Sequence, residues 1–209
     1  MTSAVVAALS VAACGNLSQG GIGAQAVGML MGAGGMPSPQ VTVSGADMMA
    51  SPGTYMQVNT RATGAWDTLV KGGENAGRET WIGTTGRSYT FEDGVVVATR
   101  GLSRDMMGAD ASVVWQAISA GGGSYVRQQD YLNDLDQIDT FVLQCVLTAK
   151  GSDPASRDDK SIPANRFEEQ CQSENLSFSN IYWLGADGKM LRSLQAVSPD
   201  AGYLQIEVF

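Results

Sequence analysis

The chain has 209 residues, which suits one domain with a tail. It carries 13 Lys and Arg against 21 Asp and Glu, a formal net charge of −8, and no histidine. The missing basic patch excludes a nucleic-acid-binding function, and the missing histidine excludes Ser-His-Asp or Cys-His catalysis and His-ligated zinc.

The N-terminus has the pattern of an export signal. Residues 4–13 are small and apolar except for Ser10, a run that fits the core of a signal peptide and is too short to span a membrane. The segment 11–14, Val-Ala-Ala-Cys, resembles the lipobox of bacterial lipoproteins. The resemblance implies cleavage of residues 1–13 and acylation of Cys14, with palmitate as one of the chains. The alternatives are an ordinary secretory signal or an apolar N-terminal strand, and residues 1–13 lack the basic segment that usually precedes such a core.

Residues 14–53 form a predicted tether rich in Gly, Ala, Ser and Met. Segments this poor in bulky residues rarely build a core of their own. In lipoproteins retained at the inner membrane, Asp often follows the acylated cysteine, and this chain has Gly15 instead. We therefore expect a lipid anchor in the outer membrane, with the protein on the periplasmic face.

Residues 54–209 are predicted to form a single β domain. Runs of alternating polarity predict strands, which two turn signals, Glu92-Asp93-Gly94 and Gly185–Gly188, arrange into hairpins. The strands are expected at 88–91, 95–99, 124–132, 138–149, 175–184, 189–197 and 203–209, with a short helix at 111–120 and a polar loop at 151–161. The 26 glycines also favour β structure, because glycine inside a helix costs about 1 kcal/mol. The predicted fold is a mainly β, antiparallel barrel-like or strongly curved half-barrel sheet with one or two short helices.

The three cysteines predict one disulfide. An odd count is unusual for an exported protein, and acylation of Cys14 would leave Cys145 and Cys171 to pair in an oxidising periplasm. The alternative is two buried free thiols.

Two polar segments are candidate sites. Residues 99–110 bring Arg100 and Asp110 into a compact turn, which suits either a polar contact site or an Arg–Asp pair that fixes the loop. The acidic segment 130–139 lacks the calcium-loop pattern and is read as a solvated connection between strands. Several carboxylates could form a glycosidase pair, but no spacing singles out two of them.

Four stretches together resemble the YjbF/GfcB family of lipoproteins from group 4 capsule and exopolysaccharide operons. They are RSYTFEDGVVVATRGLSRDMMGAD (87–110), the Tyr-Leu segment that leads to the first cysteine of the pair (131–145), the E-x-x-C of 168–171, and NIYWLGADGKMLRSLQAVSPDAGYLQIEV (180–208). The resemblance implies an outer-membrane lipoprotein that acts in polysaccharide secretion and is encoded beside a large outer-membrane barrel and a periplasmic capsule protein. Such a barrel or a periplasmic secretion protein is the expected partner. It brings no catalytic residue, and nothing in the sequence indicates a cofactor or a metal site.

The leading hypothesis is a non-enzymatic accessory lipoprotein that presents its β domain to a secretion partner or to glycan. Its candidate surface combines aromatic, guanidinium and amide groups, which suit sugar faces and hydroxyls: Tyr182, Trp183, Arg192, Ser193 and Gln195. The alternatives are a periplasmic carrier with a lipid or lipid-linked glycan in a half-barrel cavity and a carboxylate-based, glycan-active enzyme.

Overall fold

The computed structural model describes residues 43–157 and 160–209, so the predicted signal peptide, Cys14 and most of the predicted tether lie outside these ranges. The helices are α2 (Gly45–Ala50) and α3 (Ser112–Ser119). The strands are β1 (Tyr55–Thr60), β2 (Ala65–Asn75), β3 (Arg78–Gly83), β4 (Ser88–Glu92), β5 (Val95–Arg100), β6 (Met106–Ala109), β7 (Gly122–Leu132), β8 (Ile138–Ser152), β9 (Ala155–Arg157), β10 (Lys160–Ile162), β11 (Asn165–Gln172), β12 (Ser177–Leu184), β13 (Met190–Ser198) and β14 (Gly202–Val208).

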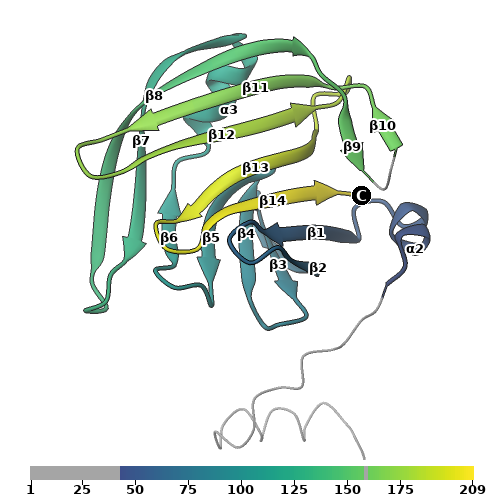
Figure 1. Cartoon of the computed structure of the whole chain (residues 1–209), viewed down its shortest axis with the longest axis horizontal. Coiled ribbons are helices and arrows are strands. Elements are labelled where there is room, and N and C mark those ends of the chain that lie inside the picture. The colour runs from purple at the N-terminus through teal and green to yellow at the C-terminus, as the bar shows by residue number, and fades with distance from the viewer. Residues whose placement is uncertain (1–42, 158–159) are drawn as a thin grey trace, which may run out of the picture. The chain divides into compact units, whose positions relative to one another are not determined.

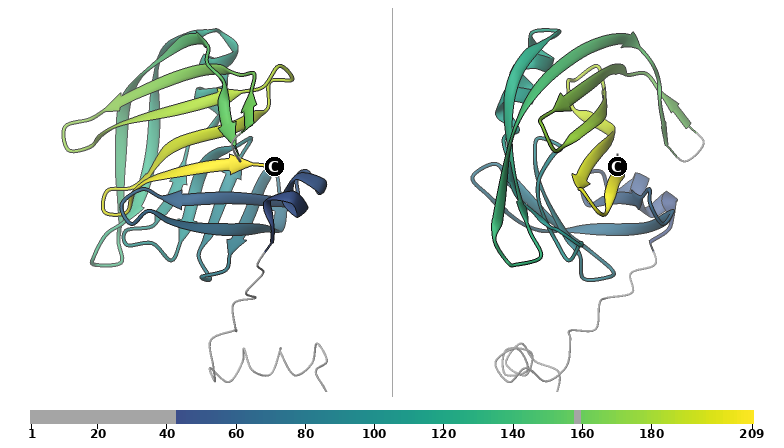
Figure 2. Two further views of the ribbon diagram at one scale, coloured as in Figure 1. Left: turned by 45° about the vertical axis from the view of Figure 1, so that its right-hand side comes forward. Right: turned by 60° about the vertical axis from the view of Figure 1, so that its left-hand side comes forward.

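Twelve of the strands form one antiparallel sheet that curls into a nearly closed barrel. Their order is β5-β4-β3-β2-β1-β14-β13-β12-β11-β8-β7-β6, and β9 and β10 pair separately. Figures 1 and 2 show the sheet wrapping around its own interior, which brings the edge strands β5 and β6 together. At this seam the backbone N of Met106 donates to Oγ1 of Thr99 at 3.0 Å. The predicted antiparallel barrel-like sheet with short helices is confirmed.

The β4–β5 hairpin shows how local sequence sets the strand pairing. Glu92 pairs with Val95, which leaves Asp93 and Gly94 as a two-residue turn. Their φ angles are +50° and +85°, as in the type I′ turns that match the right-handed twist of paired strands. The predicted turn signal is therefore correct.

The acidic segment 130–139 comprises the end of β7, the turn at 133–137 and the start of β8. Oδ1 of Asn133 accepts hydrogen bonds from the backbone N of Leu135 at 2.9 Å and of Gln137 at 3.0 Å. Arg104 forms an ion pair with Asp139 at 3.3 Å. These contacts give the segment a defined conformation, and it connects two strands as the sequence predicts.

Side chains fill the interior of the sheet. Because alternate residues of a strand face opposite sides, each strand sends a row of side chains inward. They pack with one another and with α3, so this part of the interior is a filled core. Its largest cluster consists of Met56, Val58, Leu69, Trp81, Tyr89, Phe91, Val96, Met106, Tyr131, Val197, Leu204 and Ile206.

Two regions differ from the sequence expectations. Residues 151–161, expected as a polar loop, contain the end of β8, the strand β9 and the start of β10. This prediction is wrong because a small hairpin with mostly exposed side chains needs no apolar alternation. Helix α2 lies within the predicted tether, and its Met48 is buried. Among the described residues, neither helix is long and apolar enough to cross a membrane.

Candidate functional site

The register of the sheet aligns four side chains across the outer face of β11 to β14. Arg166 pairs with Trp183, and Trp183 with Arg192. Arg192 in turn pairs with Glu207, and we call these four residues the Trp183 row. The guanidinium carbons of Arg166 and Arg192 lie 5.6 and 5.2 Å from the centre of the Trp183 ring, within range of a cation–π interaction. The row thus places an indole ring between two guanidinium groups.

Acidic side chains balance the cations near β11. Oδ2 of Asp153 accepts a hydrogen bond from Nε1 of Trp183 at 3.2 Å and lies 3.4 Å from Nη1 of Arg166. Arg166 also forms an ion pair with Glu168, which in turn lies 3.1 Å from Nζ of Lys150. These contacts hold the indole in place and leave no large excess of either charge.

The other guanidinium of the row is held in a similar way. Nε of Arg192 lies 3.9 Å from Oε1 of Glu207, and its Nη1 donates to the carbonyl of Ser156 in β9 at 3.5 Å. The row therefore offers a planar, hydrogen-bonding surface rather than an attractive net charge.

Three of the predicted surface residues face inward instead. The exposed fractions of Tyr182, Ser193 and Gln195 are 0%, 1% and 1%. Because side chains alternate along a strand, Tyr182 is buried while its neighbour Trp183 is half-exposed. The prediction of one shared surface is corrected: Trp183 and Arg192 lie outside, and the other three belong to the core.

Gln195 links opposite walls of the barrel. Its Oε1 accepts from the backbone N of Val96 at 3.0 Å, and its Nε2 donates to the carbonyl of Gly94 at 2.8 Å. A Cβ atom on Gly94 would lie only 2.9 Å from Cβ of Met190. The β4–β5 turn thus approaches β13 too closely for a larger residue, and the Gln195 amide fastens it there.

Arg100 and Asp110 stabilise separate parts of their segment. Nη1 of Arg100 donates to the carbonyls of Thr99 and Met106, at 2.5 and 3.1 Å. Oδ1 of Asp110 accepts from the backbone N and the hydroxyl of Ser112 at 3.0 and 2.8 Å, at the start of α3. Both side chains have local structural roles.

The loop between β5 and β6 is held by Asp105, which sequence reasoning did not single out for this role. Its carboxylate accepts from the backbone N of Gly101 at 2.8 Å and of Leu102 at 3.0 Å. The hydroxyl of Thr99 donates to it at 2.8 Å. The Asp105 carboxylate therefore uses its hydrogen bonds to hold this loop in shape.

A buried ion pair lies on the inner face of β7 and β11. The side chains of Arg127 and Glu169 are 1% and 0% exposed, and Nη1 of Arg127 lies 3.0 Å from both carboxylate oxygens. The hydroxyls of Tyr125 and Tyr182 donate to Glu169 at 2.7 Å, as does Nδ2 of Asn180. We call these five residues the Glu169 cluster.

The electrostatics of the Glu169 cluster keep its charges fixed. Burial alone would raise the pKa of Glu169, but the charge of Arg127 and the hydrogen bonds from the tyrosines and Asn180 outweigh it and hold that pKa below its usual range. Burial and the negative charge of Glu169 raise the pKa of Tyr125 and Tyr182. The tyrosines therefore remain donors, and Glu169 is poorly suited to act as a general acid.

The disulfide Cys145–Cys171 is confirmed and joins paired residues of β8 and β11. Sγ of Cys171 lies 3.3 Å from Oε1 of Glu169, but a disulfide sulfur has no proton to donate. The ligand atoms of these three residues lie within 4.8 Å of one another. Because metal binding needs thiolates, the disulfide removes this group from consideration as a metal site.

Glu168 and Glu169, two of the carboxylates available for glycoside cleavage, do not face a common site. Glu168 and Glu169 are adjacent and point to opposite faces of the sheet, Glu168 toward the outer ion pairs and Glu169 toward Arg127. Asp200 accepts a hydrogen bond from the hydroxyl of Ser103 at 3.2 Å. Each of these three groups therefore has a structural partner of its own.

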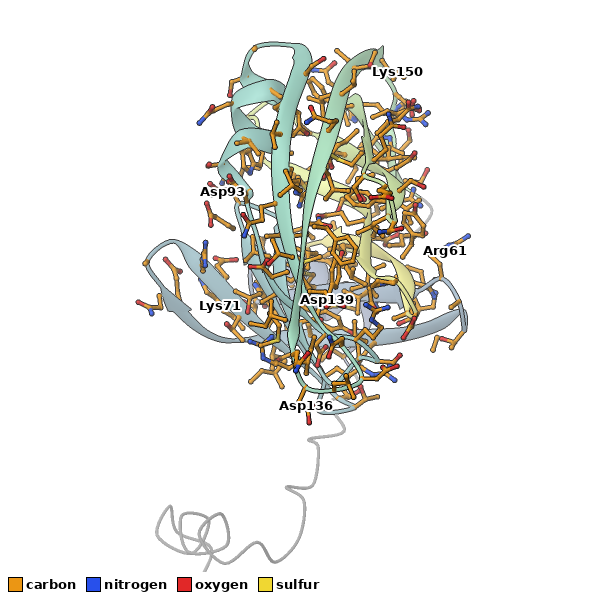
Figure 3. All side chains as sticks on the ribbon, turned by 90° about the vertical axis from the view of Figure 1, so that its left-hand side faces the viewer. Arg61, Lys71, Asp93, Asp136, Asp139 and Lys150 are labelled. Atoms are coloured by element: carbon orange, nitrogen blue, oxygen red, sulfur yellow. A yellow bond between two sulfur atoms is a disulfide. The ribbon has the colours of Figure 1, made fainter. Side chains whose placement is uncertain are left out.

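A second outer feature was missed by sequence reasoning. Near the disulfide, a hollow of about 380 Å³ opens on the outer face of β8, β11 and β12. Its polar lining consists of Gln144, Gln170, Gln172, Ser177, Ser179 and Tyr203, and we call it the Gln hollow. Its sequence signal is a pair of uncharged segments, because residues 140–149 and 177–184 contain no Asp, Glu, Lys or Arg. Figure 3 shows two charged residues of the β7–β8 hairpin, Lys150 and Asp136, at its opposite ends.

Comparisons with known proteins agree with this fold and suggest a family. Residues 23–209 match the model of the family described as group 4 capsule polysaccharide lipoprotein GfcB, YjbF. The crystal structure of the hypothetical lipoprotein YmcC from Escherichia coli K12 is similar, with a TM-score of 0.68 and 16% sequence identity over 91% of this chain and 96% of that chain. At this identity the structural likeness concerns the fold alone. No curated protein matches the chain.

Proposed function

This chain belongs to the YjbF family of group 4 capsule polysaccharide lipoproteins, and on that premise we propose that it is a non-enzymatic accessory protein of polysaccharide export. In this proposal, acyl chains on Cys14 anchor it to the periplasmic leaflet of the outer membrane. Two or three such chains suffice for stable anchoring. The β domain then presents its outer face to the polysaccharide or to a secretion protein.

The Trp183 row is the observation that carries this proposal. It holds a half-exposed indole between two guanidinium groups, and tryptophan and arginine are among the residues that dominate the energetics of recognition surfaces. The surrounding ion pairs fix its orientation before any partner arrives. Such preorganisation lowers the entropy lost on binding.

The carrier alternative has less support. A carrier needs an apolar cavity inside the barrel, and here the inner faces of the central strands carry packed side chains together with the charged Glu169 cluster. A lipid placed there would have to displace both.

The experiment measures secreted capsular polysaccharide in a deletion strain. We expect secretion to fall, and to be restored by the wild-type gene but not by Cys14→Ala at equal protein level. Trp183→Ala is expected to restore it only in part. Trp66→Ala is the matched control, because Trp66 is 52% exposed on β2, away from the row. Unchanged secretion in the deletion strain would refute the proposal.

A further inference from the structure

The Gln hollow arises where the sheet splits. Strand β12 pairs with β13 only from Ile181 onward, so its first half has lost that neighbour. Tyr203 of β14 takes the vacant place, because its phenolic oxygen accepts the backbone N–H of Ser179 at 3.1 Å. The phenol ring is thereby fixed at one side of the hollow, and three strands supply the rest of the lining.

Among the described residues, the amides of the hollow are free, unlike Gln195 and Gln205 on the neighbouring strands β13 and β14. Within the part of the chain that the structure describes, no hydrogen bond engages the side chains of Gln144, Gln170 or Gln172, and all three are exposed. By contrast, Gln195 bonds to two backbone groups and Gln205 donates to Glu207 at 2.8 Å. The hollow thus gathers unused donors and acceptors in one place.

The register places these groups in a regular grid. Gln172 pairs with Gln144 on one side and with Ser177 on the other, and Gln170 pairs with Ser179. Each amide and each hydroxyl can both donate and accept. The grid therefore matches a ligand whose own groups both donate and accept, which is the chemistry of sugar hydroxyls, while the phenol ring offers an apolar face to the ring carbons.

The lining also selects against charged ligands. It contains no Lys, Arg, Asp or Glu, although the chain carries 34 such residues. A volume of about 380 Å³ falls in the range of small-molecule sites. An acidic or basic ligand would lose its hydration there without gaining a partner of opposite charge.

We propose that the Gln hollow binds an uncharged stretch of polysaccharide, gripped by the amides of β8 and β11 and stacked on Tyr203. This assignment rests on the proposed function for the choice of polymer, and it adds a site distinct from the Trp183 row.

The test uses the full chain with Cys14→Ala, which removes the acylation site, and capsular polysaccharide purified from the producing strain. Migration through native gels that contain the polysaccharide gives the affinity. We expect the polysaccharide to retard the protein whose hollow is unaltered. The retardation should change little as the salt concentration is raised, because counterions do not compete with neutral hydrogen bonds. Gln170→Ala with Gln172→Ala should weaken binding by roughly tenfold or more, since each lost hydrogen bond contributes about 1 kcal/mol.

Matched controls separate the hollow from its surroundings. Gln116→Ala with Gln128→Ala removes two exposed glutamines outside the hollow and should leave retardation unchanged. Tyr203→Phe removes the phenolic oxygen that Ser179 needs, and Tyr203→Ala also removes the ring. We expect Tyr203→Ala to weaken binding more than Tyr203→Phe.

Three results would overturn the assignment. The first is that the protein with an unaltered hollow is not retarded. The second is that its retardation is salt-sensitive and survives in the Gln170/Gln172 variant. The third is that the protein sediments as a dimer and that only this variant abolishes the dimer. The last would make a second copy the occupant. The proposed function fails separately, through unchanged secretion in the deletion strain. If the deletion abolishes secretion while the Gln170/Gln172 variant fully restores it, only the hollow assignment is wrong.

Discussion

The two faces of strand β11 use polar side chains in opposite ways. On the inner face, Glu169 accepts hydrogen bonds from four side chains and forms a buried ion pair. On the outer face, its neighbour Gln170 has an exposed amide without a partner among the described residues. The inner group is charged and saturated, and the outer one is neutral and free.

This difference separates stability from recognition. A buried charge is tolerated only when its partners are complete, because an unpaired one costs several kcal/mol. An exposed amide costs almost nothing, because water satisfies it until a ligand arrives. We therefore expect substitutions on the inner face to change the free energy of unfolding, and those on the outer face to change binding.

Glu169→Gln should have the largest effect on stability. It leaves the Arg127 guanidinium buried without its counter-charge, and we expect a loss of about 3–5 kcal/mol in the free energy of unfolding, measured by urea denaturation. Glu168→Gln is the control on the outer face. Its partly exposed ion pairs should contribute less than about 1 kcal/mol, and equal losses in the two variants would contradict the comparison.

Removal of the disulfide should have the next largest effect. Cys145 and Cys171 are 26 positions apart, and a loop of this length predicts a loss of about 2–4 kcal/mol in the Cys145→Ser/Cys171→Ser variant. The same denaturation experiment under reducing conditions should bring the wild type to the stability of this variant. A reduced wild type that keeps its full stability would show that the crosslink adds nothing to the strand pairing.

Acidification should lower the contribution that Glu169, on the inner face, makes to the free energy of unfolding. Because the pKa of Glu169 is lowered by folding, its contribution is complete above the unfolded value of about 4.3 and is lost as pH falls through the folded pKa. The stability difference between wild type and Glu169→Gln should be constant near neutral pH. Below about pH 4 it should shrink by at most about 1.4 kcal/mol per pH unit, and a difference independent of pH down to acid unfolding would contradict the lowered pKa.

The strands that could be predicted from sequence are those with an alternating apolar face or a clear turn. The β4–β5 hairpin has the turn signal and the last strand has the apolar face, and the structure places them at Ser88–Arg100 and Gly202–Val208. Strand β11 was not predicted, because its inner face carries Glu169 beside Cys171 and its outer face carries Glu168 and Gln170. Polar residues on both faces hide the alternation that reveals a strand.

The candidate site was predictable only in part, for a related reason. Alternation along a strand implies that Tyr182 and Trp183 face opposite sides of the sheet, but which side is buried depends on how the whole sheet curls. Ser193 and Gln195 share the buried side with Tyr182 because β13 pairs with β12 in that register. The Gln hollow needs side chains from four strands and a split between β12 and β13, neither of which is visible in local sequence.

The substitutions in the Gln hollow should have the largest effect on binding. They should also have the smallest effect on stability. Gln170→Ala with Gln172→Ala removes two exposed side chains that bond to no other residue within 43–157 and 160–209, so the free energy of unfolding should change by less than about 0.5 kcal/mol per residue. Urea denaturation of the variant beside the gel assay measures both quantities on one protein. A variant that loses polysaccharide and keeps its stability would show that the outer face of β11 is reserved for a ligand. A variant that loses stability instead would place these amides in the framework, and the contrast between the two faces would disappear.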